Sequence, residues 1–297
     1  MKGNSRAYLF ALIAVILWGF SFIWANYLIS SKVEILCFVF ERMLIASVVL
    51  WVAGLILGKI QKIAFKDFKW FFLLAFGEPF IYFIGENYGM KFIGSAVITS
   101  VIIATIPIFS LFAEKIVYNS PLTLLKIIGV LISVPAVYFV VSNGTSLEGI
   151  NTFGLLFFIL SIIGSIIYSF MVIKLYNRGY NVITIVAWQF TIGALLFLPL
   201  FLIFGLKGLN SVYFSFKVQS TIFTLALLCS CLCFSLWSYV TAKLGVTRSN
   251  IFAVLIPAVS AVGAYMYGQE ILTTTKMAGI LLVAAGIVLV QWKQSAH

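Results

Sequence analysis

Hydrophobic residues occur along this chain in long runs separated by short polar connections. A helix that crosses the hydrocarbon core of a bilayer needs about 20 mostly apolar residues. Ten segments meet this requirement: 8–28, 35–57, 68–89, 94–113, 122–142, 153–173, 181–204, 218–241, 247–267 and 274–292. The pattern predicts an all-α integral membrane protein with ten transmembrane helices.

The composition indicates that lipid is the main solvent and partner of this chain. Of its 297 residues, 63% are hydrophobic and 9% are charged, whereas soluble domains carry about 25% charged residues. The formal net charge of +11 would suggest a nucleic-acid partner in a soluble protein. Here the basic residues stand singly between apolar runs, so membrane topology explains them and no nucleic-acid partner is expected.

Basic residues are divided unequally between the two sides of the predicted bundle. With a cytoplasmic N-terminus, thirteen lysines and arginines fall on the inner side, five fall on the outer side, and Arg42 lies within a span. Cytoplasmic loops are enriched in lysine and arginine, and the bias is strongest in the connection 58–69. We therefore expect a multi-pass protein of a bacterial inner (plasma) membrane with both termini in the cytoplasm.

Three of the four cysteines lie close together in sequence, as Cys229, Cys231 and Cys233. Residues two apart on a helix point in different directions, and zinc sites usually combine cysteine with histidine at other spacings. The single histidine is the last residue, His297. We interpret the cysteines as packing residues and expect no metal site and no cofactor.

The chain contains an internal repeat with an offset of 150 residues. Positions 104–141 align with 254–291 without a gap, with nine identical pairs. Among these pairs are Pro107 and Pro257, Lys126 and Lys276, and Gly129 and Gly279. Since five spans is an odd number, the second repeat must lie inverted relative to the first. The sequence predicts two inverted five-helix repeats, 1–146 and 147–297, and such repeats are typical of secondary transporters.

Several short motifs occur in the order and spacing of a known family. They are Trp18-Gly19 in the first span, Arg42 within Phe40-Glu41-Arg42, Pro107 and Pro257, and the turn Gly268-Gln269-Glu270 before Leu272-Thr273. In these features the chain resembles the EamA family of the drug/metabolite transporter (DMT) superfamily. It departs from the family pattern in its first repeat, where Asn119-Ser120-Pro121 replaces the Gly-Glu turn.

The resemblance implies a basket of helices around a central cavity, with the fifth and tenth helices outside it. Relatives move amino acids, nucleotide derivatives and other metabolites, often outward. Ionisable groups inside a membrane cost about 2.5–3.5 kcal/mol each on insertion scales, so their positions point to the chemistry of such a cavity.

The third span carries two acidic residues on one broad face. Glu78 lies near the middle of the span, and Tyr82 and Glu86 follow at positions i+4 and i+8. A carboxyl group at this depth is expected to bind an amine-bearing substrate or to exchange protons. The alternative is a hydrogen-bonded glutamate that fixes a kink at Pro79.

Arg42, in the second span, is expected in the outer half of the membrane, at a depth similar to that of Glu86. We expect Arg42 to pair with Glu86 as an outer gate, with Glu41 as a competing partner; a static bridge that orients the second span is the alternative. Asn26, in the first span, belongs to the same level.

The matching level of the second half contains no charged side chain. Its candidate substrate-binding residues are Tyr168, Gln189, Trp237 and Asn250. Together with Trp18, the aromatic residues are candidates to line a ligand cavity; packing between helices is the alternative for each.

Prolines and glycines suggest where helices bend or approach closely. The symmetric prolines, Pro107 and Pro257, are candidate hinges for alternating access, and a fixed bend is the alternative. Gly129, Gly279 and Gly286 favour close helix packing and are compatible with a homodimer.

The leading hypothesis is a secondary active transporter of a small polar metabolite, such as an amino acid or related amine-bearing compound. Export is the favoured direction, and proton coupling is compatible with the buried glutamates. The alternatives are a membrane channel and a non-transporting membrane scaffold, although no repeated filter or ring of like charges is visible. An enzyme is not expected, because the spans lack a histidine base for a serine nucleophile.

Overall fold

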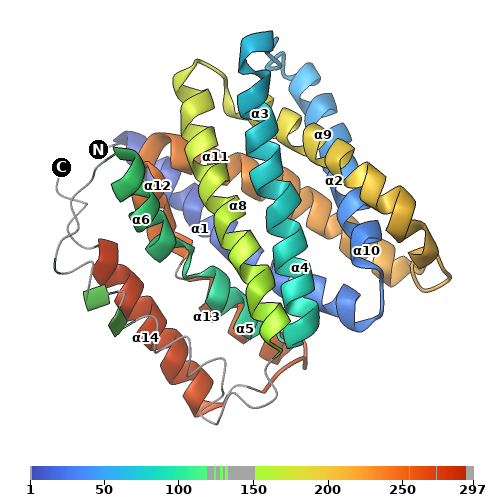
Figure 1. Cartoon of the computed structure of the whole chain (residues 1–297), viewed down its shortest axis with the longest axis vertical. Helices are drawn as coiled ribbons and strands as arrows, with labels where there is room; N and C mark the ends of the chain where they lie inside the picture. Colours follow the sequence, from blue (N-terminus) through green and yellow to red (C-terminus); the bar gives the residue numbers. More distant parts are fainter. Residues whose placement is uncertain are drawn as a thin grey trace.

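The computed structural model describes residues 2–118, 124, 128–129, 131–132, 151–253, 255–271 and 273–291, and every regular element within these ranges is helical (Figure 1). The expected span 122–142 lies almost wholly outside the described residues. The other nine expected spans coincide with single helices or with runs of two or three consecutive helical elements.

The first half opens with two continuous helices and continues with two interrupted segments. The continuous helices are α1 (Lys2–Ser30) and α2 (Ile35–Ile56). The third segment contains η1 (Phe65–Asp67), α3 (Phe68–Ala75), the π-helical turn η2 (Phe76–Ile81) and α4 (Tyr82–Ile93). The fourth contains α5 (Ala96–Ile103) and α6 (Ile106–Tyr118).

The second half has the same order of continuous and interrupted segments. It begins with α8 (Thr152–Asn177), followed by α9 (Val182–Leu200) with η3 (Phe201–Gly205) and η4 (Leu206–Gly208). Next come α10 (Phe216–Thr224), η5 (Leu225–Cys233) and α11 (Phe234–Leu244). The last elements are α12 (Val246–Ala253), α13 (Ile256–Met266) and α14 (Thr274–Gln291).

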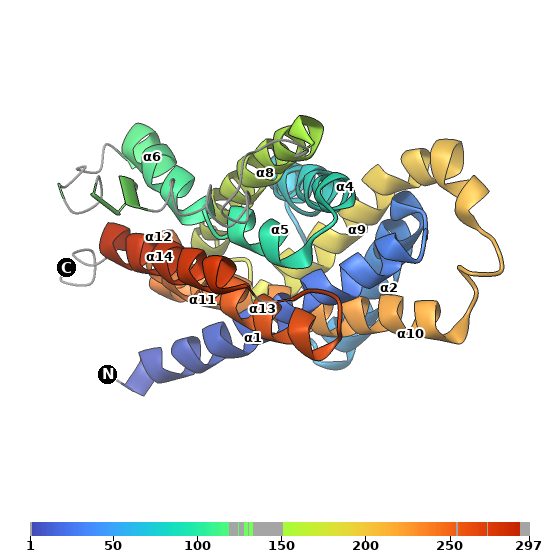
Figure 2. The same cartoon turned by 90° about the horizontal axis from the view of Figure 1, so that it is seen from below.

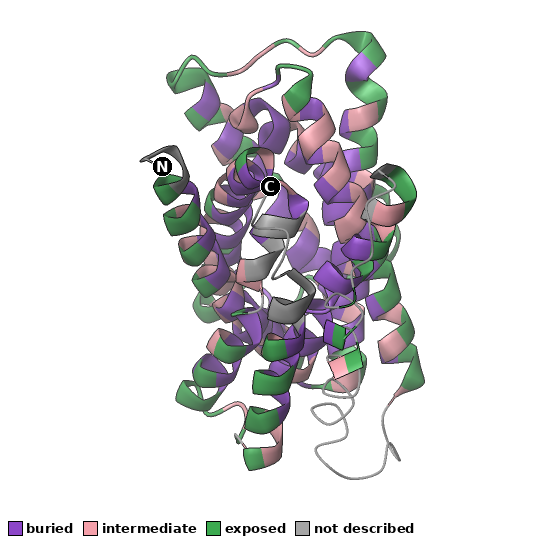
Figure 3. Cartoon of the chain, turned by 90° about the vertical axis from the view of Figure 1, so that its left-hand side faces the viewer, coloured by how far each residue is buried: buried purple, intermediate pink, exposed green. Residues whose placement is uncertain are grey.

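Seven helical segments among the described residues are long and apolar enough to cross a membrane. They are Ser5–Ser30, Ile35–Ile56, Phe65–Ile93, Ala96–Val117, Thr152–Asn177, Val182–Gly208 and Phe216–Leu244. Ile256–Met266 and Thr274–Gly286 are shorter apolar helices. Exposed residues on the outer faces of these helices include large hydrophobic side chains such as Ile16, Val52 and Leu195 (Figure 3). This arrangement suits a multi-pass membrane protein whose outer surface meets lipid.

The core forms where helices from the two halves of the chain pack against each other. The most extensive packing is between α4 and α8, α2 and α9, α1 and α11, and α1 and α13. α5 lies between α4 and α13 (Figure 2). Neither half therefore buries its own core alone.

Glycines allow the tightest of these crossings. A Cβ at Gly164 would lie 2.4 Å from the carbonyl oxygen of Gly77, and a Cβ at Gly85 would lie 2.4 Å from the carbonyl oxygen of Phe157. Close backbone approach through small residues is the usual way in which membrane helices pack.

The fourth and ninth expected spans are each broken beside the prolines that the sequence offers as hinges or fixed bends. α5 ends at Ile103 and α6 begins at Ile106, while α12 ends at Ala253 and α13 begins at Ile256. The second residue of each following helix is a proline, which lacks the N–H of a helix interior but suits a first turn. The two breaks are 150 residues apart, as are the prolines.

We predict that Gly164→Ala lowers the apparent melting temperature of the detergent-solubilised protein. The new Cβ would meet backbone rather than a movable side chain, and overpacking of this kind costs about 1–3 kcal/mol. Gly154→Ala on the same helix is the matched control, because its nearest neighbours are side-chain atoms of Ile93 and Phe92 at 3.0 and 3.1 Å. Equal melting temperatures for the two variants would contradict a tight crossing at Gly77.

Candidate functional site

A cavity lies among helices from both halves of the chain. Its volume is about 60 Å³, which leaves room for a few water molecules. Its polar lining comes from Ser21, Arg42, Glu78, Tyr82, Glu86 and Ser165. Its aromatic lining comes from Trp18, Phe22, Phe83, Tyr168, Phe234 and Trp237. The cavity thus combines one basic and two acidic side chains with a largely aromatic wall.

Glu78 occupies the point at which the third segment is broken. Its backbone is extended (φ −144°, ψ 116°) between helical neighbours, and the peptide bond to Pro79 is cis. The amide Nε2 of Gln189 on α9 donates to the carbonyl oxygen of Glu78 at 2.9 Å. The Glu78 side chain is 6% exposed, lines the cavity and makes no hydrogen bond to any described residue. The break is therefore held through the backbone, which leaves the carboxyl group available to a ligand.

Glu86 lines the same cavity two turns further along. The hydroxyl of Tyr82 donates to its Oε1 at 3.0 Å. Among the described residues, no ion pair joins Glu86 to Arg42 within 4.0 Å. The direct pair expected from the sequence is thus not formed, and the guanidinium donates instead to a residue of η5.

That partner of Arg42 is a serine from the second half of the chain. Arg42 Nε donates to Ser230 Oγ at 2.7 Å, and the guanidinium carbon lies 4.4 Å from the ring centroid of Phe83. Arg42 is 3% exposed and Ser230 is fully buried. One edge and one face of the guanidinium are thereby fixed by the protein.

Phe234, at the start of α11, is the centre of the aromatic wall. Its ring centroid lies 5.4 Å from that of Trp18, 5.8 Å from Tyr168 and 5.2 Å from Phe190. Trp18 also contacts Trp237 at 5.1 Å. These tilted and edge-to-face pairs hold each ring in one orientation.

The break between α5 and α6 and the break between α12 and α13 both border the cavity. Ile103, Ile106 and Pro107 line it from the α5–α6 break, and Ala253 and Ile256 line it from the α12–α13 break. The two interrupted segments therefore meet the cavity at corresponding positions.

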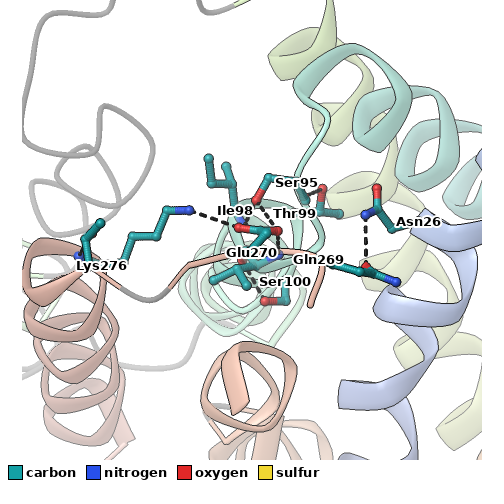
Figure 4. A network of polar contacts seen from close by, with 10 residues as sticks. Asn26, Ser95, Ile98, Thr99, Ser100, Gln269, Glu270 and Lys276 are labelled. Carbon is teal, nitrogen blue, oxygen red and sulfur yellow. Dashed lines mark hydrogen bonds and ion pairs between the residues drawn. The ribbon is translucent and has the colours of Figure 1, made fainter. Parts of the chain in front are cut away.

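Asn26 lies in a separate polar network, shown in Figure 4, and not among the residues that line the cavity. Its Nδ2 donates to Oε1 of Gln269 at 3.1 Å, and Gln269 Nε2 donates to the carbonyl oxygen of Ile23 at 3.1 Å. The adjacent Glu270 accepts from Ser95 Oγ at 2.8 Å and from Lys276 Nζ at 2.9 Å (Figure 4). The turn after α13 thus ties the second half to α1 and to the start of α5.

Glu41, the competing partner expected for Arg42, is also engaged elsewhere. It accepts hydrogen bonds from the hydroxyl of Tyr213 and, at 3.5 Å, from Gln219. Burial raises the pKa of Tyr213, and the hydrogen bond to Glu41 raises it further. The phenol therefore keeps its proton and acts as the donor, which holds the connection before α10 against α2.

The remaining candidates from the sequence fall into three groups. Trp18, Tyr168 and Trp237, the candidate aromatic lining, border the cavity, and so does Pro107, the candidate hinge. Gln189 binds the Glu78 backbone and Pro257 is the second residue of α13, but neither is among the lining residues. The side chain of Asn250 lies outside the described residues.

Neither the contacts of Arg42 with Ser230 and Phe83 nor the central place of Phe234 among the rings could be foreseen from the sequence. Ser230, Phe83 and Phe234 resemble ordinary apolar-span residues in sequence, so composition alone does not distinguish them. The cysteines near Ser230 contact backbone: Cys229, Cys231 and Cys233 direct their Sγ atoms at carbonyl oxygens of α1 or α2, 3.6–3.7 Å away. Within the described residues no three His, Cys, Asp or Glu side chains gather as metal ligands.

Comparisons with known proteins support a common family and fold. A model of the EamA-like transporter family matches residues 5–142 and 152–292. An uncharacterized transporter of Archaeoglobus fulgidus is 28% identical over 240 residues, which is 81% of this chain and 83% of that protein. The uncharacterized transporter YdfC of Bacillus subtilis is 27% identical over 251 residues, 83% of this chain and 78% of that protein.

A solved crystal structure that is 15% identical to this chain aligns with a TM-score of 0.71. The alignment covers 97% of this chain and 98% of the solved chain, so the two share a fold. The family resemblance drawn from short sequence motifs is confirmed by the match of the family model.

We predict that Glu270→Gln destabilises the protein by about 1–3 kcal/mol, the range for lost hydrogen bonds to charged groups. The carboxylate of Glu270 accepts from Lys276 Nζ and also, at 3.2 Å, from the backbone N–H of Val97 near the start of α5. Glu34→Gln is the matched control, because Glu34 precedes α2 without a side-chain cap hydrogen bond. Melting curves in detergent check the prediction, and an equal loss in both variants would contradict it.

Proposed function

We propose that this chain, which belongs to the EamA-like transporter family, is a secondary carrier that exports a small, polar, amine-bearing metabolite by alternating access. The observation that supports this most directly is that Arg42, Glu78 and Glu86, all within membrane-spanning segments, line one cavity. Charges at this depth are costly, so a set of them around one cavity favours a transport pathway over a packing role.

The proposed architecture is ten helices in two inverted repeats, 1–146 and 147–297. The breaks at corresponding positions of α5–α6 and α12–α13 support it. Packing supports it too: α1 contacts α11 and α13, and the corresponding helix of the second half, α8, contacts α4 and α6. The ranges matched by the family model, 5–142 and 152–292, fall on either side of the proposed boundary.

In this proposal Glu78 and Glu86 bind the amine of the substrate. The carboxyl group of Glu78 makes no hydrogen bond to any described residue, and one oxygen of Glu86 accepts from Tyr82. The rings of Trp18, Trp237 and Phe234 provide flat apolar surface for the rest of a small ligand. Exchange of the substrate for a proton on Glu78 would couple export to a proton gradient.

The cavity has to widen for a metabolite to pass, since it measures about 60 Å³. Discontinuous membrane helices typically form the substrate site of a carrier, at the interface between its repeats. Pro107 and Pro257 stand at the two interruptions, so rotation about them would change the mouth of the cavity without disturbing the continuous helices. The alternatives are a channel, which would conduct without saturation, and a non-transporting scaffold, which would show no flux.

We predict that vesicles reconstituted with this protein take up labelled amino acids or amines in a saturable manner, with acceleration by the same unlabelled compound inside. Glu78→Gln is expected to lower the initial rate at least about tenfold, because the substrate ammonium loses its buried counter-charge. Glu41→Gln is the matched control and should stay within about twofold of the wild type, since Glu41 bonds to Tyr213 outside the cavity. Flux that rises linearly and shows no counterflow would contradict a carrier.

The proposed orientation places both termini in the cytoplasm of a bacterial inner membrane. We predict that Lys62→Cys is labelled by a membrane-impermeant maleimide only after the cells are opened, whereas Lys217→Cys is labelled in intact cells. Both lysines are exposed, and the four native cysteines are buried, so background labelling should be low. The reverse pattern would contradict the proposed orientation.

A further inference from the structure

A groove runs along α8 between α3 and α6, and Figure 1 shows α8 between these two helices. Its volume is about 810 Å³, within the range of about 300–1,000 Å³ found for ligand pockets. The groove is separate from the central cavity, since the two share no lining residue. Most of its wall is apolar and includes Leu73 of α3, Ile116 and Val117 of α6, and Phe170 and Met171 of α8.

The apolar wall of the groove faces the hydrocarbon of the bilayer. The helices α3, α6 and α8 all belong to segments that are long and apolar enough to cross a membrane. On α6, Ile116 is 84% exposed and Val117 is 58% exposed. Side chains exposed within the hydrocarbon meet lipid and not water, so an acyl chain is the natural occupant of this wall.

One end of the groove is polar, because it is lined by the C-terminal end of α8, with Lys174, Asn177 and Arg178. Arg178 is paired with Asp67 of η1, which also accepts from the hydroxyl of Tyr180 at 2.9 Å. Lys174 is half-buried and makes no hydrogen bond or ion pair with any described residue. Lys174 is therefore a cation in the groove that still lacks a counter-charge.

An indole ring brings a second ammonium group close to this end of the groove. The Nζ of Lys174 lies 3.2 Å from the centroid of the Trp70 ring, and the Nζ of Lys69 lies 4.8 Å from the same centroid. The ring attracts each ammonium through its quadrupole but carries no net charge, so the two cations still repel each other. A bound anion would neutralise this repulsion.

The apolar wall and the basic end together identify the chemistry of the occupant. A free phosphate would bind at the basic end but leave the wall empty, whereas a neutral lipid would fill the wall and leave Lys174 without a counter-charge. An anionic phospholipid satisfies both parts. In the proposed orientation this end faces the cytoplasm, where the leaflet carries a negative surface potential and basic pockets between helices suit phosphate headgroups.

We propose that this groove binds one anionic phospholipid, with an acyl chain along α8 and the headgroup phosphate at Lys174 and Lys69. The proposal requires only that the chain lies in a membrane, so it holds or fails independently of the carrier proposal. A lipid bound in this way would join α6, the helix that follows the α5–α6 break, to α3 and α8.

The test compares lipids that differ only in their headgroup. The full chain is purified in detergent and delipidated, and native mass spectrometry measures its affinity for phosphatidylglycerol and for phosphatidylcholine with the same acyl chains. One phosphatidylglycerol is expected to bind at least about fivefold more tightly than phosphatidylcholine, the effect of one basic group near an anionic surface. Glycerol 1-phosphate, which has no acyl chain, is expected neither to bind nor to displace the lipid at the same concentration.

Charge variants test the assignment of the headgroup. Lys174→Gln should reduce the preference for phosphatidylglycerol to within about twofold, and Lys174→Arg should retain it, because the positive charge is kept. Lys62→Gln is the matched control: it removes an exposed lysine from the connection before η1, outside the groove, and should leave the preference unchanged.

Steric variants test the place of the acyl chain. Ala113→Phe adds a ring to the wall of the groove and should weaken binding of both lipids at least about fivefold. Val117→Phe repeats the block at a more exposed position, with less effect on folding. Ala53→Phe, at an exposed position of α2 outside the groove, is the control and should change neither affinity. The melting temperature without added lipid reports that each variant is folded.

Each contrary result overturns the proposal in a recognisable way. Equal affinity for the two lipids, or an unchanged preference in Lys174→Gln, would remove the anionic headgroup from this end. Glycerol 1-phosphate that binds as tightly as the lipid would indicate a phosphate site without an acyl chain. A chain that binds no lipid would overturn the proposal: a dimeric mass would assign the groove to a second copy, and a monomeric mass would show that the chain itself closes it.

Discussion

The hydrogen bond from Gln189 to the carbonyl oxygen of Glu78 is the interaction on which the cavity depends. A break in a membrane helix leaves backbone groups without intrahelical partners, and an unsatisfied group in hydrocarbon costs several kcal/mol. Gln189, on α9, supplies a donor at 2.9 Å. Since the backbone is satisfied in this way, the Glu78 carboxyl is not needed to hold the break and can face the cavity instead.

The same break also requires the two halves to approach closely. A Cβ added to Gly193 would lie 2.5 Å from Cγ of Pro79, so Pro79 packs closely against α9. Just before the break, Gly164 on α8 packs against the carbonyl oxygen of Gly77 in the same way. Larger side chains at either glycine would push α8 or α9 away from the third segment. The position of Glu78 in the cavity is therefore fixed jointly by residues more than 80 positions away in the sequence.

Local sequence features predicted the elements of this fold but not its pairings. Apolar runs located the spans, and helical spacing placed Glu78, Tyr82 and Glu86 on one face, where they now line one cavity. The partner of Arg42 could not be predicted in this way, because Ser230 lies 188 positions away and looks like any small residue of an apolar span. Asn26 illustrates the same limit, because the predicted depth of a residue in the membrane does not say which neighbour its side chain will face.

The two halves of the chain correspond more closely in their helices than in the positions of their charged residues. At the offset of 150 residues, Trp18 corresponds to Tyr168 and both line the cavity, whereas Arg42, Glu78 and Glu86 correspond to Ile192, Leu228 and Leu236. A ligand bound by charge would therefore be held by the first half, and the second half would contribute mainly aromatic surface and Ser230. In such a carrier the polar contacts need not be broken when the helices at the two breaks move. Movement would then change which mouth is open while the charged ligand keeps its partners, which limits the desolvation that each transport cycle has to overcome.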